Sequence, residues 1–291
     1  MTGGFPPAVT RVFTRLQAPT KTQTRQNWLR AVAVRTTRQH PDLAAELVKI
    51  LGIELRGNEA NPLGNLSIEE IAVCYEALLA TLDSRRRRSA GQFFTPDDAA
   101  AFMAVQSRDF PAGTWLDPCC GVGNLAWHLV AAQSNPARFV RENLVLIDVD
   151  ETALRSAVAL LGAGFLSGGD HEGLAQLWAK AYHRDFLSKS ELVPHEFVIV
   201  NPPYARAKEY PGLECAASRE YFAYFLEKIA KTSRGFIAVT PASYLCVPKF
   251  VVLRGILERE QPVGLTANCG HVPLMRLVVV FWFFLVVLGG I

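Results

Sequence analysis

The segment NPPY, Asn201–Tyr204, places an amide, two prolines and an aromatic ring directly after the apolar run FVIV. Pro202 and Pro203 have no backbone N–H, so they fix a turn at the carboxyl edge of a predicted strand, where doubly wound sheets bind ligands. The side-chain oxygen of Asn201 and the carbonyl of Pro202 would offer two acceptors to an NH2 group, with Tyr204 stacked beside it. Two such acceptors favour attack of the nitrogen on an electrophile. A simple Asn-Pro-Pro turn is the alternative.

The segment DPCCGVGNL, Asp117–Leu125, lies between a predicted strand and a predicted helix. Gly121 and Gly123 allow close approach of a ligand to the backbone, although the same spacing also occurs in plain strand–helix turns. The segment lacks the Lys and Ser/Thr of a phosphate-binding P-loop, which disfavours an NTPase. Asp148 ends the next predicted strand, where Rossmann folds bind ribose hydroxyls. Because Asp150 suits the helix N-cap better, we expect Asp148 to be free for an adenosine-containing cofactor.

A third candidate is HRDFL, His183–Leu187. Asp185 could accept a hydrogen bond from an exocyclic amine, and Phe186 could stack on an adenine ring. A surface acid beside a core ring is the more common reason for an isolated Asp-Phe pair. The segment therefore supports a cofactor site only together with its neighbours.

Short apolar runs alternate with helical patterns from Thr114 onward, and this alternation predicts an α/β fold with a parallel sheet and helices on both faces. The apolar tail is shorter than the roughly 20 residues of a bilayer helix, so it predicts one buried strand or two short ones and no membrane partner. The expected strands are Thr114–Pro118, Asn143–Asp150, Glu196–Pro203, Gly235–Pro241, Val263–Cys269 and the tail Leu277–Leu288.

The first 90 residues are expected to form a basic, mostly helical region. Residues 41–52 have helical spacing and a final glycine, and residues 67–83 begin with a Ser-x-x-Glu capping box. Residues 1–41 contain seven Lys or Arg and no acid, and Arg85–Arg88 adds a second basic cluster. These charges favour either contact with nucleic acid phosphates or a solvated, partly disordered terminus. The change of pattern places a domain boundary near Arg88–Gly91 and a second domain over residues 91–291.

Two further classes of protein are disfavoured by the pattern of residues. The six cysteines contain no CxxC pair and the six histidines no HExxH, so we expect neither disulfides nor a metal site. Pro6, Pro7 and Pro19 should interrupt an amphipathic helix, which argues against a transit peptide. With no secretory signal, a cytoplasmic location is expected.

GQFFTP (Gly91–Pro96), DPxxGxGxx and NPPY follow one another in the order found in N6-adenine DNA methyltransferases of restriction-modification systems, which the chain resembles. The likeness is strongest to the modification subunit of type I systems and to related fused enzymes, in which a helical region precedes the first motif. It implies a Rossmann-like, S-adenosylmethionine-dependent methyltransferase sheet and DNA as the substrate. It also implies that the target adenine is flipped out of the duplex.

The resemblance also implies roles for individual residues. Asp148 would hold the ribose of S-adenosylmethionine, Asp185 and Phe186 would hold its adenine, and the turn Asn201–Tyr204, with Pro202 and Pro203, would hold the target base. The residues expected to contact the methionine part are Phe94, Thr95, Asp117, Cys119, Gly121 and Gly123.

The chain stops soon after its apolar tail, without the target-recognition domain of such enzymes. We therefore expect either a partner that reads DNA, with specificity and restriction subunits as candidates, or a truncated product. Two other functions stay open: a protein-glutamine or RNA methyltransferase, since NPPY suits other planar nitrogens, and a non-catalytic cofactor-binding subunit. GQFFTP favours DNA.

Overall fold

The computed structural model describes residues 7–57, 59–82, 95–188, 191–207, 210, 212–272 and 275–283. Among these residues, no helix combines the length and the apolar character needed to cross a membrane.

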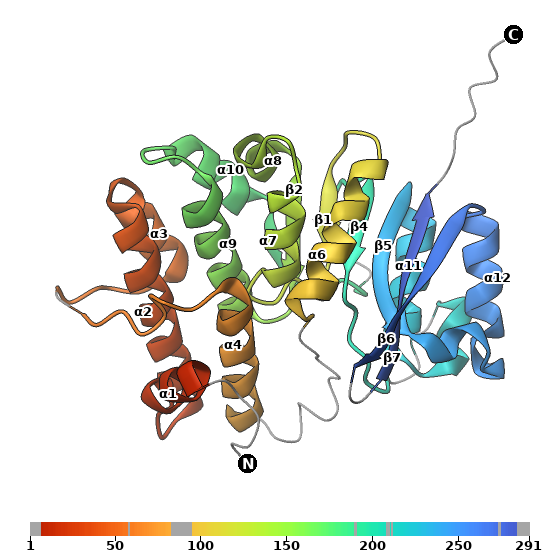
Figure 1. Ribbon diagram of the computed structural model, residues 1–291, viewed down its shortest axis with the longest axis horizontal. Coiled ribbons are helices and arrows are strands. Elements are labelled where there is room, and N and C mark those ends of the chain that lie inside the picture. Colours follow the sequence, from red (N-terminus) through yellow and green to blue (C-terminus); the bar gives the residue numbers. More distant parts are fainter. Residues whose placement is uncertain are drawn as a thin grey trace, which may run out of the picture.

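A seven-stranded sheet forms the centre of the molecule, in the order β3-β2-β1-β4-β5-β7-β6 (Figure 1). The first five strands are parallel, whereas β7 runs antiparallel to both β5 and β6. The strand order reverses between β1 and β4, so the carboxyl ends of these two strands flank the position where such folds bind ligands. The strands are β1 Trp115–Asp117, β2 Leu144–Asp148, β3 Ala181–His183, β4 Phe197–Val200, β5 Gly235–Pro241, β6 Gly264–Val272 and β7 Met275–Phe283.

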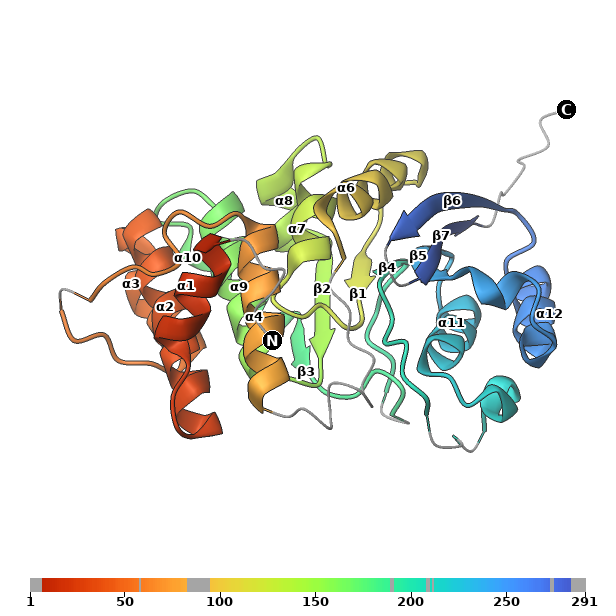
Figure 2. The ribbon, with the colours of Figure 1, turned by 60° about the horizontal axis from the view of Figure 1, so that its bottom comes forward.

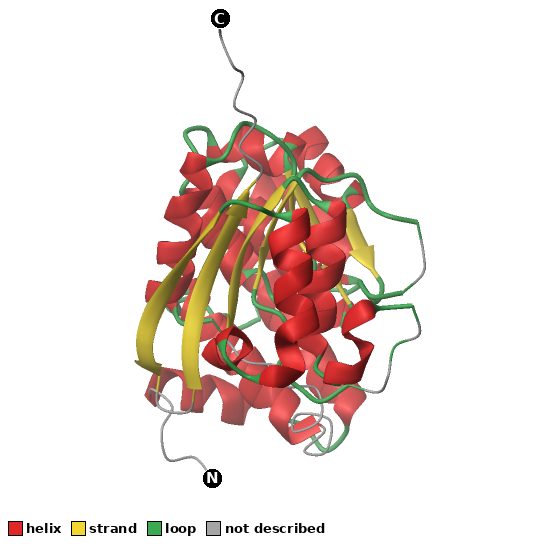
Figure 3. Cartoon of the chain, turned by 90° about the vertical axis from the view of Figure 1, so that its right-hand side faces the viewer, coloured by secondary structure: helices red, strands yellow, loops and turns green. Residues whose placement is uncertain are grey.

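Two hydrophobic cores cover the two faces of the sheet, because successive side chains of a strand point to opposite faces. On β1, Trp115 belongs to one core and Leu116 to the other. The first core includes α6 Asp97–Gln106, α7 Asn124–Ala131, α8 Pro136–Glu142, α9 Glu151–Phe165 and α10 His171–Ala179. The second includes α11 Tyr221–Thr232 and α12 Val251–Glu260. Figure 3 shows the strands between these two helical layers.

The N-terminal helices extend the first core and pack beside α9 and α10 (Figure 2). Ser67 and Glu70 form the predicted capping box, since each side chain accepts a hydrogen bond from the backbone N–H of the other. Gly52 ends its helix in the left-handed conformation, with φ of 64°. The helices are α1 Pro7–Leu16, α2 Lys21–Gln39, the 3-10 turn η1 Pro41–Leu43, α3 Ala44–Leu51 and α4 Ile68–Leu82.

The expectation that proline interrupts an amphipathic helix near the N-terminus is wrong for Pro7. Pro7 occupies the first position of α1, where its missing N–H costs no helical hydrogen bond. Val9, Val12 and Leu16 lie on the buried side of this helix. Residues 7–16 are therefore packed helix and not a solvated tail.

Five of the six predicted strands lie where expected. The sixth, the apolar tail, forms a single strand, β7, over the part of the tail that is described. β3 was not predicted, because its three residues are half-exposed or exposed and form no apolar run. The parallel pattern does not extend to the end of the chain, since β6 and β7 form an antiparallel hairpin. The predicted domain boundary near Arg88–Gly91 lies outside the described residues.

Candidate active site

Three adjacent strands bring the predicted chemical groups to one edge of the sheet. β2 ends at Asp148, β1 ends at Asp117, and β4 is followed by Asn201. The Sγ atom of Cys119 lies 3.2 Å from the backbone oxygen of Asn201, which joins the turn after β1 to the turn after β4. Sites predicted from segments more than 80 residues apart are therefore neighbours.

The glycines of the turn after β1 both adopt positive φ angles, 55° at Gly121 and 93° at Gly123. The backbone N–H of Gly121 donates to Oδ2 of Asp148 at 2.7 Å. A Cβ atom at Gly123 would lie 3.1 Å from Cβ of Ala157, whereas one at Gly121 would meet nothing within 4 Å. Gly121 thus lines open space suited to a ligand, and Gly123 allows α7 to approach α9.

These two glycines provide a matched pair for a stability experiment. Gly121→Ala should lower the free energy of unfolding by about 1 kcal/mol, the cost of a left-handed alanine. Gly123→Ala should cost roughly 1–3 kcal/mol more, because its methyl group overpacks the contact with Ala157. Urea unfolding of both variants measures the difference. Equal losses would contradict the proposed contact of Gly123 with α9.

Asp148 is not the N-cap of the helix that follows β2, as expected, but each of its carboxylate oxygens already accepts a hydrogen bond from a backbone N–H group. The residue is 5% exposed, and its Oδ1 accepts a hydrogen bond from the backbone N–H of Asp150 at 2.7 Å. With Gly121 on the other oxygen, the carboxylate joins the turns after β1 and β2. Asp150 is the N-cap of α9 as predicted, since it accepts from the N–H of Thr152. The ribose-binding role of Asp148 stays a prediction.

The two carboxyl groups at this edge have unusual acidities. Burial raises the pKa of Asp117 to about 8, and the charge of Asp148 adds to this effect. Burial likewise raises the pKa of Asp148 to about 6, although its backbone hydrogen bonds oppose the shift. Within the described part of the chain, neither carboxylate forms an ion pair with lysine or arginine. A cationic ligand is the chemical group that would favour their ionised forms.

The Asn201 amide is hydrogen-bonded at both ends. Its Nδ2 donates to Oγ1 of Thr95 at 2.8 Å, and its Oδ1 accepts from the hydroxyl of Tyr204 at 2.6 Å. The same hydroxyl lies 2.9 Å from the backbone oxygen of Val239. The hydroxyl has one proton, so Oδ1 of Asn201 and the oxygen of Val239 compete for it.

The turn that carries the amide reaches the molecular surface. Asn201, Pro203 and Tyr204 are partly exposed, while Pro202 is buried. Thr95 and Pro96 are the described part of the motif at residues 91–96. The backbone oxygen of Thr95 accepts from Nδ2 of Asn124. Phe94 lies outside the described residues. The structure therefore brings Thr95, Asp117 and Asn201 into one connected region.

The Asp-Phe pair lies at the turn after β3. Asp185 is exposed and accepts a hydrogen bond from the backbone N–H of Leu187 at 2.9 Å. Phe186 is 5% exposed, and its ring centroid lies 5.2 Å from that of Phe225 on α11. This packing uses part of the ring surface that the sequence assigned to adenine stacking.

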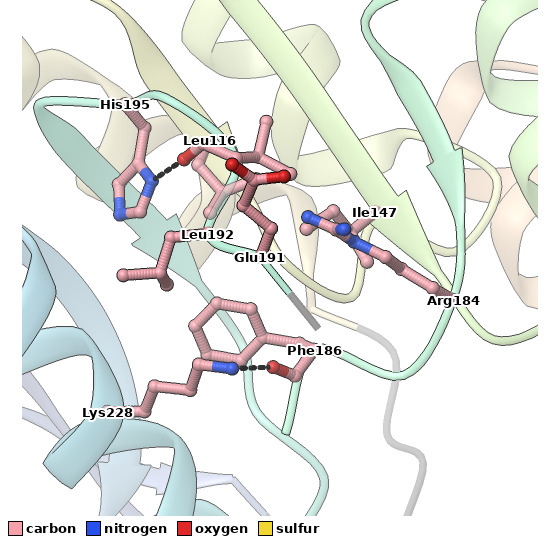
Figure 4. A pocket seen from close by; sticks show the side chains of 9 residues that line it. Leu116, Ile147, Arg184, Phe186, Glu191, Leu192, His195 and Lys228 are labelled. Carbon is pink, nitrogen blue, oxygen red and sulfur yellow. Dashed lines mark hydrogen bonds between the residues drawn. The ribbon is translucent and has the colours of Figure 1, made fainter. Parts of the chain in front are cut away.

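A small hollow lies beside this turn (Figure 4). Leu116, Ile147 and Phe186 supply apolar surface, and Glu191, His195 and Lys228 add polar groups. The ammonium of Lys228 donates to the backbone oxygens of Phe186 and Ser188, which ties the turn to α11. His195 and Lys228 were not predicted from the sequence, because neither lies in a motif.

The structure resembles known methyltransferases over nearly its whole length. The type IIG restriction endonuclease BpuSI superposes with a TM-score of 0.58 at 15% identity, over 97% of this chain and 40% of that chain. A putative class I S-adenosylmethionine-dependent methyltransferase from Listeria monocytogenes has a TM-score of 0.52 at 14% identity, over 96% and 88%. At these identities the likeness shows a Rossmann-like methyltransferase fold.

The sequence comparisons identify the family. Residues 67–235 match the model of the N-6 DNA Methylase family, and the chain belongs to this family. A type II methyltransferase, M.VspI from Vibrio sp. (strain 343), is 28% identical over 155 residues, which are 52% of this chain and 32% of that protein. The chain thus spans about a third of the length of this curated relative.

Proposed function

We propose that this protein transfers a methyl group from S-adenosylmethionine to the N6 amine of adenine in DNA, as part of a restriction-modification system. Membership of the N-6 DNA Methylase family supports the reaction. The observation that carries the proposal is the Asn201 amide, which is held by Thr95 and Tyr204 at the sheet edge where Asp117 and Asp148 end β1 and β2.

The residues at the edge of β1 and β2 fit a sulfonium cofactor. Two buried carboxyl groups without a described basic partner suit a ligand that carries positive charge. The open space at Gly121 allows the ligand close to the backbone. We assign the methionine part to Thr95, Asp117 and this turn, the ribose to Asp148, and the adenine to Asp185 and Phe186. Phe94 belongs to the same assignment.

The turn after β4 would orient the amine for methyl transfer. Oδ1 of Asn201 and the carbonyl of Pro202 would accept its two hydrogens, and Pro203 would keep the turn rigid. The ring of Tyr204 would stack on a base flipped out of the duplex. When bound, S-adenosylmethionine would supply an electrophilic methyl group for the amine, with the thioether as the leaving group and the displaced amine proton passing to water. Catalysis would depend on positioning, because no charged base is needed first.

The length of the match limits what this chain does alone. Because the chain spans about a third of the M.VspI relative, we propose that DNA recognition requires a further domain or a specificity subunit. A restriction subunit is the other candidate partner. One structure of similar fold, with a TM-score of 0.56 at 12% identity, is that of a DrdV–DNA complex.

A methyl-transfer assay tests the proposal. The full chain is incubated with S-adenosylmethionine carrying a labelled methyl group and with unmethylated DNA, RNA or protein, with and without a specificity subunit. Label recovered as N6-methyladenine in DNA supports the proposal. Label in RNA or in protein glutamine would replace it with the corresponding transferase. Cofactor binding without any transfer, even with the subunit, would indicate a non-catalytic component.

A further inference from the structure

We propose that the N-terminal helical region completes the cofactor site, with Arg25 and Tyr75 acting as positioning residues that hold Asp148 through Asp150. The proposal rests on the cofactor role assigned to Asp148 above. It gives this basic region a task beyond any contact with nucleic acid. Neither residue would touch the cofactor itself.

Two helices from the N-terminal region reach the same carboxylate. Nη1 of Arg25 on α2 donates to Oδ1 of Asp150 at 2.5 Å, and the hydroxyl of Tyr75 on α4 donates to Oδ2 at 2.9 Å. Arg25 also donates to Oγ1 of Thr152 at 2.8 Å. The Asp150 side chain is 14% exposed and that of Arg25 is 33% exposed, so a mostly buried carboxylate accepts charge-assisted hydrogen bonds, which are stronger than neutral ones.

The anchored residue controls the turn that ends β2. Asp150 is two residues from Asp148, and the residue between them, Val149, is 54% exposed and contributes little packing. The backbone N–H of Asp150 donates to Oδ1 of Asp148, whose Oδ2 accepts from Gly121. A displacement of Asp150 would therefore move Asp148 and the glycine turn after β1 together.

The charge of Asp150 is maintained by its N-terminal partners. Burial alone would raise the pKa of Asp150, but the hydrogen bond and charge of Arg25, with the Tyr75 hydroxyl, lower it below its ordinary value. Without Arg25, a largely buried carboxylate close to Asp148 would have no described cation beside it. Such an uncompensated charge would have to move or become protonated, and either change would disturb the turn.

The rest of the interface offers a matched control. Nη1 of Arg155 on α9 donates to the backbone oxygen of Ile50 at 2.7 Å, so it links the same two parts of the molecule. Arg155 makes no described contact with Asp148 or Asp150. A purely structural role of the interface would make Arg25 and Arg155 equivalent.

The test measures cofactor affinity and thermal stability of the full chain in parallel. Calorimetric titration with S-adenosylmethionine should show about a tenfold weaker affinity for Arg25→Met and about a threefold weaker one for Tyr75→Phe. The cofactor affinity of Arg155→Met should stay within about twofold of the wild type, even if its Tm falls as much as that of Arg25→Met. The reason is that Arg155 does not contact Asp150 or Asp148. Arg25→Lys, which keeps the charge, should recover part of the loss.

Unchanged cofactor affinity in Arg25→Met and Tyr75→Phe would overturn the proposal. It would also be overturned if Arg155→Met lost as much cofactor affinity as Arg25→Met. If Arg25→Met does not fold, Tyr75→Phe and Arg25→Lys carry the same comparison. Failure of the proposed function gives a different result. The wild type would then bind the cofactor and the variants would show the expected losses of affinity, but the wild type would methylate no adenine.

Discussion

Replacement of Asn201 by alanine is expected to lower kcat for methyl transfer about 10²- to 10³-fold, the usual loss when one preorganised hydrogen-bonding group is removed from a transition state. The amide oxygen is the side-chain acceptor that we assign to the substrate amine. Of the cofactor groups we assign, Asn201 contacts Thr95 through one neutral hydrogen bond, so S-adenosylmethionine affinity should fall about fivefold or less, far less than kcat. Single-turnover methylation and calorimetric cofactor binding measure the two quantities separately.

Tyr204→Phe is the matched comparison for this variant. It retains the aromatic ring for stacking and removes the hydroxyl that lies 2.6 Å from Oδ1 of Asn201. The expected loss is about fivefold, since a single neutral hydrogen bond contributes about 1 kcal/mol. If Asn201→Ala methylates at the full rate with cofactor bound, the amide does not orient the amine. If both variants lose the same factor, Asn201 acts only by holding Tyr204.

Local sequence signals predicted the elements that depend on local chemistry. The capping box of Ser67 and Glu70, the left-handed Gly52 and the N-cap Asp150 each depend on residues within a few positions of one another. Apolar runs such as Phe197–Val200 are buried on both faces of the sheet, and this gives a strong signal in a single sequence. These features predicted the positions of the parallel strands in the chain and the location of the ligand-binding edge.

Features that depend on contacts distant in the sequence could not be predicted in this way. The contact of Asp148 with Gly121 is recognisable only once the turns after β1 and β2 lie side by side. In the sequence, Arg25 is one of several basic residues and carries no signal of its own. Its contact with Asp150 could not be predicted, because the two residues are 125 positions apart. The antiparallel β6–β7 hairpin was missed because an apolar strand has the same pattern in either direction.

In the candidate site, the residue types could be predicted from the sequence, whereas the acidities of the carboxyl groups could not. The residue types at Asp117, Asp148 and Asn201 indicated where chemistry occurs, because these polar groups end apolar strands. The acidities of the two carboxyl groups depend on burial and on neighbouring charges, which are set by the fold. The raised pKa of Asp117 follows from its almost complete burial, at 1% exposure, and from the neighbouring charge of Asp148.

These acidities predict opposite effects of pH on cofactor binding and on stability. A sulfonium cofactor requires ionised carboxylates, so its affinity should rise as pH increases from about 6, the pKa of Asp148, to about 8, the pKa of Asp117.

For the cofactor-free chain, stability should change with pH in the opposite direction. Both folded-state pKa values lie above the ordinary 3.8, so the folded chain holds more protons than the unfolded chain. The free energy of unfolding should therefore fall as pH rises from about 4 to about 8.

Asp117→Asn separates these two effects. Its amide oxygen can still accept the N–H of Cys119, which lies 3.3 Å from Oδ1 of Asp117, but it has no charge to offer a cation. S-adenosylmethionine affinity near pH 8.5 should fall about 10- to 100-fold, as expected for a lost charged hydrogen bond. The cofactor-free variant should melt at a higher temperature than the wild type at that pH, by about 2–4 °C for each kcal/mol gained.

Calorimetry and thermal unfolding at about pH 6 and about pH 8.5 measure both effects, on either side of most of the titration of Asp117. Near pH 6 the wild-type Asp117 is mostly protonated, so the wild type and Asp117→Asn should converge in both affinity and melting temperature. A wild-type affinity that does not change between these pH values, together with full affinity in the variant, would show that Asp117 does not meet the cofactor's charge. Such a result would leave its burial as a purely structural feature of the turn after β1, and the assignment of the methionine part to this edge would fail with it.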